Sequence, residues 1–140
     1  MKIYKANKKG MINYLLLVFF LLPVIVVLSN QDSFIKNTLK ILPLFIPLSL
    51  LIWAYLDTYY KIEKTLLIYR SAFLRGKIEI ASIREIVKGT TVWVGLKPSL
   101  ATKGMLVKFN KFDEIYIAPV SNEELIADLL KTNPKIIVKD

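Results

Sequence analysis

The chain has 140 residues, enough for one ordinary domain, and 54% of them are hydrophobic while only 22% are charged. The mean hydropathy is +0.47 and the formal net charge is +9, which excludes disordered and low-complexity classes. The absence of Cys and His excludes disulfides and thiolate chemistry, and removes the commonest metal ligand and general base. The composition therefore indicates a lipophilic, basic protein with few residues suited to catalysis.

The first predicted element follows a basic N-terminal segment, residues 1–10, which carries four lysines and no acid. Residues 11–29 then form an uncharged, almost wholly apolar run that contains Pro23. About 20 apolar residues in a helix cross a ~30 Å hydrocarbon core, so this run predicts a transmembrane helix. A cleaved signal peptide is the alternative, but the run is longer than the usual ~7–15 residues and no A-x-A-like site follows it.

The second apolar run is shorter, and we predict a second transmembrane helix over about residues 39–56. Lysines before the run and aromatic residues at its end can extend it to the membrane interfaces. Pro43 and Pro47 leave a re-entrant or interfacial helix as the alternative. Residues 11–56 are thus expected to form a transmembrane hairpin, and the positive-inside rule places both termini in the cytoplasm.

Residues 57–140 follow a different pattern and are predicted to form a separate domain of mixed, mainly β structure. Short alternating or β-branched segments indicate an antiparallel barrel or sandwich of about six or seven strands, one of them over residues 90–96. A closing helix is expected over about residues 121–132, because Ser121 and Glu124 form a capping box and Asn133-Pro134 ends the apolar periodicity. The predicted fold class is therefore α+β, with a helical hairpin followed by this domain.

The order of strands and one closing helix is typical of the pleckstrin-homology (PH) superfold. Six strings strengthen the likeness: Asp57–Lys61 (DTYYK), Leu67–Arg70 (LIYR), Lys77–Ile80 (KIEI), Ile83–Ile86 (IREI), Lys97–Ala101 (KPSLA) and Ile115–Pro119 (IYIAP). Together they resemble the YyaB-like bacterial PH-domain family over roughly residues 57–137, although Ala81 and Ala118 stand where the pattern prefers Leu and Ser. The resemblance implies a PH-like binding domain that follows two transmembrane segments.

The positive charge of the domain is concentrated in its strands. Residues 57–111 carry a net charge of +7, whereas residues 112–140 carry −3. Basic side chains close to an anionic leaflet are favourable, so we expect membrane-surface contact from the basic residues of the first strands. They are Lys61, Lys64, Arg70, Arg75, Lys77, Arg84 and Lys88. The alternative is a solubilising surface, and the first hairpin loop, only Glu63-Lys64, does not favour specific phosphoinositide recognition.

The remaining candidate is Trp93, which alternates with Val92 and Val94 and is expected either to anchor a protein or peptide partner or to pack in the core or at a strand edge. Adjacent acid pairs such as Glu123-Glu124 do not face each other, so we expect no catalytic residues, no cofactor and no metal. Nucleic-acid binding is not expected, because no platform of interleaved aromatic and basic residues is present.

These observations predict a non-enzymatic binding or scaffolding module on the cytoplasmic face of the bacterial inner membrane. Its expected partners are the lipid bilayer and a protein, a peptide or a second copy of the chain. An accessory subunit of a membrane transport or enzyme complex is the alternative function.

Overall fold

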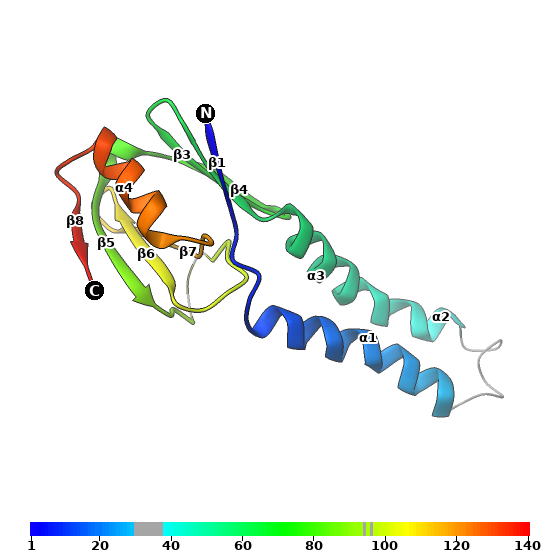
Figure 1. Ribbon diagram of the computed structural model, residues 1–140. Coiled ribbons are helices and arrows are strands. Elements are labelled where there is room, and N and C mark those ends of the chain that lie inside the picture. The colour runs from blue at the N-terminus through cyan, green and yellow to red at the C-terminus, as the bar shows by residue number, and fades with distance from the viewer. Residues whose placement is uncertain (30–37, 94, 96) are drawn as a thin grey trace.

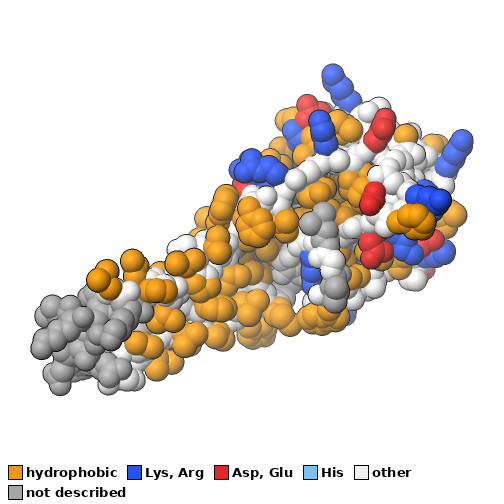
Figure 2. All heavy atoms as spheres, turned by 180° about the vertical axis from the view of Figure 1, so that it is seen from behind, with side chains coloured by type: hydrophobic (Ala, Val, Ile, Leu, Met, Phe, Trp, Pro, Cys, Tyr) orange, Lys and Arg blue, Asp and Glu red, His pale blue; other side chains and the backbone are white. Residues whose placement is uncertain are grey.

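The computed structural model describes residues 1–29, 38–93, 95 and 97–140. The chain forms a two-sheet domain with a helical arm that projects from one end of it (Figure 1). On the face shown in Figure 2, hydrophobic side chains cover the arm, whereas lysines, arginines and acids gather on the domain. The excess of apolar residues and the excess of charge therefore belong to different parts of the molecule.

The first half of the arm is α1 (Met11–Ser29), an unbroken helix with the bounds that the sequence predicts. At 1.5 Å per residue its 19 residues extend about 28 Å, close to the thickness of a hydrocarbon core. Pro23 lies inside the helix. Among the described residues, α1 alone is long and apolar enough to be a candidate membrane span.

The second half of the arm is broken, which corrects the prediction of one helix over residues 39–56. It consists of α2 (Thr38–Ile41), a 3-10 turn (Leu42–Leu44) and α3 (Phe45–Asp57). Pro43 lies in the 3-10 turn, and its missing N–H and fixed φ prevent a continuous α-helical ladder there. α3 returns alongside α1 to the domain (Figure 1). The predicted linker between the two runs, residues 30–37, lies outside the described residues.

The first sheet has the order β1-β2-β3-β4 and is antiparallel throughout. Its strands are β1 (Lys2–Lys5), β2 (Tyr59–Glu63), β3 (Leu66–Ser71) and β4 (Leu74–Glu79). The turn between β3 and β4 is tight, and Ala72 takes a positive φ of 51° there. β1 comes from the segment that the sequence suggested was only a basic tail.

The second sheet has the order β7-β6-β5-β8, with β8 parallel to β5 and the other pairs antiparallel. Its strands are β5 (Ile83–Thr90), β6 (Gly104–Phe109), β7 (Asp113–Ile117) and β8 (Ile137–Lys139). Seven of the eight described strands lie within residues 57–140, in agreement with the predicted six or seven, and the eighth is β1, whose pairing is not visible in local sequence. The predicted strand over residues 90–96 is wrong where it is described: β5 ends at Thr90 and the chain then turns into a loop.

The core lies between the two sheets and under the closing helix α4 (Asn122–Thr132). Ser121 caps α4 as predicted, since its Oγ accepts a hydrogen bond of 3.2 Å from the N–H of Glu124. Leu125 and Leu129 of α4 are fully buried, and they pack in one cluster with apolar side chains of both sheets. The mixed α+β architecture with a C-terminal helix is therefore confirmed.

The N-terminal strand also joins the two sheets. On one side β1 pairs with β2, with Tyr4 opposite Tyr60. On the other side the N–H of Asn7 donates to the carbonyl of Ala118 at 2.8 Å, and the N–H of Val120 donates to the carbonyl of Lys5 at 2.9 Å. The segment after β7 is thus held against the first sheet by β1.

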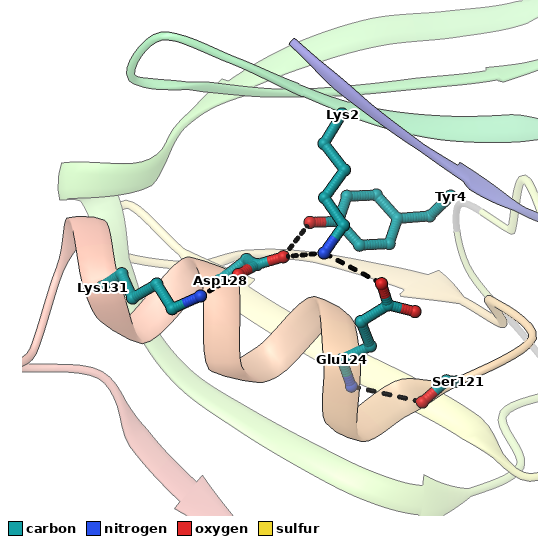
Figure 3. A network of polar contacts seen from close by, with 6 residues as sticks. All are labelled: Lys2, Tyr4, Ser121, Glu124, Asp128 and Lys131. Carbon is teal, nitrogen blue, oxygen red and sulfur yellow. Dashed lines mark hydrogen bonds and ion pairs between the residues drawn. The ribbon is translucent and has the colours of Figure 1, made fainter.

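A polar network fastens β1 to the closing helix (Figure 3). Asp128 of α4 accepts hydrogen bonds from Lys2 at 2.5 Å, from the Tyr4 hydroxyl at 2.6 Å and from Lys131 at 2.6 Å. Lys2 also lies 2.8 Å from Glu124. The donors Lys131, Lys2 and Tyr4 hold the pKa of Asp128 well below its usual range, while burial and the bond to Asp128 raise the pKa of Tyr4 to about 12.

The domain is therefore discontinuous in sequence. Its first strand precedes the arm, its second follows the arm, and both ends of the arm are fixed in the same body (Figure 1). Residues 2–7 belong to this body through strand pairing and are not a free basic tail.

Candidate membrane-facing surface

Three segments meet where the arm joins the domain, and we call this surface the helix-facing end. They are the β1–α1 linker (residues 6–10), the β3–β4 turn (residues 72–73) and the described part of the loop after β5 (residues 91–93, 95 and 97–103). The rest of the domain extends away from the arm (Figure 1). A ligand or a surface that contacts the arm close to the domain would therefore also contact these segments.

The β3–β4 turn is placed at this end by a chain of hydroxyl contacts. The Thr58 hydroxyl donates to the carbonyl of Ala54 in α3 at 2.5 Å and lies 2.7 Å from the hydroxyl of Ser71. Thr58 and Ser71 are both buried. Because Thr58 is the C-cap of α3 and Ser71 ends β3, the turn that follows Ser71 lies beside the end of the helix.

The loop after β5 lies against the first turns of α1. Trp93, Lys97 and Leu100 line a small cavity of about 130 Å³ together with Met11 and Leu15 of α1. Two buried tyrosines, Tyr60 and Tyr116, hold the loop there. The loop is thus part of the junction with the arm.

The hydroxyl of Tyr60 makes the hydrogen bonds that hold the loop after β5 at this end. It donates to the carbonyl of Pro98 in the loop at 2.7 Å and accepts a hydrogen bond from the N–H of Ala118 at 3.1 Å. The side chain is fully buried, and this burial raises the pKa of the Tyr60 phenol far above its usual value, so the group stays protonated at neutral pH. Tyr116 attaches the chain directly after this loop, because its hydroxyl accepts a hydrogen bond from the N–H of Gly104 at 2.8 Å.

Large apolar side chains are exposed around this end. Leu56 at the end of α3 is 71% exposed, and Phe73 and Trp93 are each 68% exposed. Single exposed apolar residues need no explanation, but these lie beside two helices whose outer surfaces are also apolar. Aromatic side chains of this kind are enriched where a protein meets the membrane–water interface.

The predicted surface cations are divided by the structure. Arg70 and Arg75 face each other across β3 and β4 at the helix-facing end, and Arg70 donates to Asp57 of α3 at 2.8 Å. Lys77 lies further along β4, at the middle of the pairing with β3. These three line one shallow depression on the outer face of the first sheet.

The other four predicted cations do not line this depression. Lys64 is in the β2–β3 turn, at the end of the sheet away from the arm, and Lys61 forms an ion pair with Glu63 at 2.6 Å. Arg84 is the second residue of β5 and donates to a carbonyl in the β6–β7 turn, again away from the arm. Lys88 forms an ion pair with Asp140 at 2.8 Å. Sequence reasoning grouped all seven because sequence proximity to the second apolar run does not show the direction of each strand.

The cations nearest to α1 were treated only as a topology signal in the sequence. Lys8 and Lys9 lie in the β1–α1 linker, and the Lys8 ammonium stands 4.4 Å from the centre of the Tyr55 ring of α3. Cation–π contact of this kind holds a lysine without neutralising its charge. The N-terminal lysine cluster that favoured a cytoplasmic N-terminus is therefore also part of this surface.

Trp93 lies at the junction with α1 and not on a paired strand. The Lys97 ammonium stands 5.2 Å from the centre of its ring. The alternation of residues 90–96 suggested a strand face, but the chain leaves the sheet at Thr90, and Gly95 takes a positive φ of 106°. The core reading of Trp93 is excluded by its exposure.

The acids of the described domain are largely committed to ion pairs. Glu85 accepts from Lys108 at 2.8 Å and pairs with Lys139 at 2.7 Å, and these contacts lower its pKa to about 2. Among the described residues, no three acids come together in a group that could hold a metal ion. The chemistry that this surface offers is binding by positive charge and apolar contact.

Comparison with known proteins gives one family. The family model described as "Bacterial PH domain" matches residues 58–133, which begins just before β2 and ends just after α4. No curated protein and no solved structure matches the chain. β1 and the arm lie outside the matched range. Because the match covers more than half of the sequence and the fold has the expected strands and closing helix, the chain belongs to the bacterial PH domain family.

Proposed function

We propose that this protein is a binding or scaffolding module held at the cytoplasmic face of the bacterial inner membrane by a helical hairpin. The observation that carries the proposal is the insertion of the apolar arm between β1 and β2. Since both ends of the arm are fixed in one folded domain, a chain that crosses the membrane in α1 must cross back before β2. This is the arrangement expected of the YyaB-like group, with two membrane segments and both termini on one side.

The second crossing is supported by length. Residues 38–57 form a nearly continuous helical path of α2, one 3-10 turn and α3. Twenty helical residues extend about 30 Å, which suffices for a hydrocarbon core. The break at Pro43 is tolerable in a membrane, where a neighbouring helix such as α1 can compensate locally.

The orientation of the domain is supported by the chemistry of the helix-facing end. Leu56, Phe73 and Trp93 can enter the interface, while Arg75 and Lys97 can contact anionic headgroups. Positive charge beside the ends of membrane segments favours the cytoplasmic side. The domain would then rest on the leaflet and present its sheets to the cytoplasm.

The proposed partner is a protein, a peptide or a second copy of the chain. β4 is an edge strand of the first sheet, and an edge can accept a further strand by backbone hydrogen bonds. The alternative of an accessory subunit in a transport or enzyme complex is favoured by a wholly apolar groove of about 240 Å³ between α1 and α3, lined by Phe20, Pro23, Phe45 and others, which another helix could fill.

Topology can be tested by cysteine labelling, because the natural chain has no Cys. Single variants Ile3→Cys, Ser33→Cys and Lys135→Cys are exposed to a membrane-impermeant maleimide in spheroplasts and in lysed cells. The proposal expects Ser33→Cys to react in intact spheroplasts and the other two only after lysis. Labelling of Ser33→Cys only after lysis would indicate a re-entrant arm, and loss of Ile3→Cys from the mature protein would indicate cleavage; either result overturns the hairpin.

The two functional alternatives separate in a crosslinking pulldown from native membranes. Replacing residues 11–56 by an unrelated hairpin should leave the partners of a binding module in place. A stoichiometric membrane complex that is recovered with the natural arm and lost with the replaced arm would instead establish the accessory role.

A further inference from the structure

A polar cavity at the helix-facing end lies between the β1–α1 linker and the end of α3. It has a volume of about 610 Å³ and is open to solvent on one side. This size falls within the ~300–1,000 Å³ typical of small-molecule sites. Most of its lining comes from residues 5–9 and 56–59, which lie outside the common family domain or at its very start.

One wall of the cavity is strongly basic. Lys5, Lys8 and Lys9 line it, and none of the ion pairs among the described residues includes these three lysines. The position of Lys8 is restrained by its contact with the Tyr55 ring. Three lysines in the lining of one cavity, with no acid among the lining residues, favour an anionic ligand.

The lining also contains exposed apolar side chains. Leu56 is 71% exposed and Val120 is 70% exposed, and both line the same cavity. Leu56 is also the last apolar residue of α3, so this part of the lining continues into the apolar surface of the arm. A ligand that satisfies both the lysines and the apolar residues carries a negative charge at one end and a hydrocarbon chain at the other.

We propose that this cavity binds the phosphodiester headgroup of an anionic phospholipid of the cytoplasmic leaflet. Lys5, Lys8 and Lys9 hold the phosphate, and Leu56 and Val120 contact the first methylene groups of the acyl chains. The inference rests on the proposed function, because only a membrane at the helix-facing end brings lipid to this position. A soluble phosphate ester could also bind to the lysines, but it has no hydrocarbon chain to contact Leu56 and Val120.

The test uses the full chain in zwitterionic detergent micelles and native mass spectrometry of bound lipid. Dihexanoyl phosphatidylglycerol is titrated against dihexanoyl phosphatidylcholine, and glycerophosphoglycerol serves as the soluble competitor. We expect a preference for phosphatidylglycerol that glycerophosphoglycerol does not displace at the same concentration. Displacement by that soluble ester would overturn the lipid as the ligand.

Each of the two matched variants removes three lysines, so the two variants have the same net charge as each other. The triple variant Lys5→Gln, Lys8→Gln and Lys9→Gln changes the cavity, while Lys64→Gln, Lys111→Gln and Lys135→Gln changes exposed lysines away from it. Each lysine near an anionic headgroup is expected to contribute about five-fold to affinity, so the cavity variant should lose on the order of 100-fold. The control variant should bind as the natural protein does.

Two outcomes separate this site from the proposed function. If both triple variants bind phosphatidylglycerol equally and melt at the same temperature as the natural chain, the site is overturned while the membrane topology stands. If cysteine labelling contradicts the hairpin, the proposed function fails and the lipid site fails with it. A cavity variant that keeps the natural melting temperature and labelling pattern but loses the lipid preference supports the site.

Discussion

Replacing Tyr60 by Phe removes one hydroxyl that fastens three separate segments. The hydroxyl lies on β2, donates to Pro98 in the loop at 2.7 Å and accepts from the N–H of Ala118 at 3.1 Å. The substitution keeps the ring and its packing, so no cavity of ring size is created. It leaves a buried backbone carbonyl and a buried N–H without partners.

An unsatisfied buried polar group costs about 1–3 kcal/mol, so two of them should lower the free energy of unfolding by about 2–4 kcal/mol after some relaxation. For a domain of this size, that is a lowering of the melting temperature by roughly 8 °C or more. The assay is thermal unfolding of the full chain in detergent micelles, followed by near-ultraviolet circular dichroism, which reports the packing of the domain's aromatic side chains.

The matched control is Tyr69→Phe. Tyr69 lies directly opposite Tyr60 on the neighbouring strand, but it is half-buried and its hydroxyl makes no hydrogen bond with the described residues. Its substitution should change the free energy of unfolding by less than about 0.5 kcal/mol. If the two variants melt within 2 °C of each other, on the order of the shift expected from a few tenths of a kcal/mol, the loop is not held by Tyr60 and the reasoning is wrong.

Three further predictions concern the rest of the domain. The pKa of Asp128 is lowered in the folded state, so its stabilising effect is complete above the ordinary carboxyl pKa of about 4 and is lost as the pH falls through and below that value. We therefore expect the urea midpoint to fall between pH 5 and pH 2, and to fall less steeply in Asp128→Asn; equal slopes in the two proteins would contradict the network. In Gly104→Ala, the new Cβ would lie 2.3 Å from the carbonyl oxygen of Ile117 if nothing moved, so we expect a loss of about 1–3 kcal/mol in a urea titration, and an unchanged midpoint would show that β6 and β7 are not so closely paired. Ser121→Ala should lower stability by about 0.5–2 kcal/mol by removing the N-cap, whereas Ser121→Asp should retain it, and equal losses in both variants would exclude capping as the cause.

The closing helix and the apolar arm were predictable because their signals are local. The bounds of α1 match the predicted 11–29, and α4 begins one residue after its predicted cap. Continuous apolar runs and capping boxes involve only residues within a few turns of one helix, so they can be recognised from local sequence. The break at Pro43 shows the limit of that approach, since hydrophobicity alone did not show where the ladder is interrupted.

The candidate surface was predictable only in part. Positive charge near the apolar runs was recognised, and Arg70 and Arg75 do lie at the helix-facing end. The direction in which each strand runs decides which cation lies near the arm. The alternation of apolar and polar residues in the sequence does not reveal that direction. The sequence left Trp93 open between a partner anchor and a core or strand-edge residue, and its place beside α1 depends on a loop held by tyrosines on other strands.

The sequence by itself determined that the molecule divides into an apolar arm and a basic mixed α+β domain, because hydrophobic runs and capping patterns act over short distances. Only the tertiary structure decided that the domain begins before the arm. Tyr4 pairs with Tyr60, although the whole helical arm lies between them in the sequence. Asp128, near the other end of the chain, accepts a hydrogen bond from the same strand. A four-residue strand has no periodic signal of its own, so such long-range pairing becomes visible only when the folded domain brings its partners together.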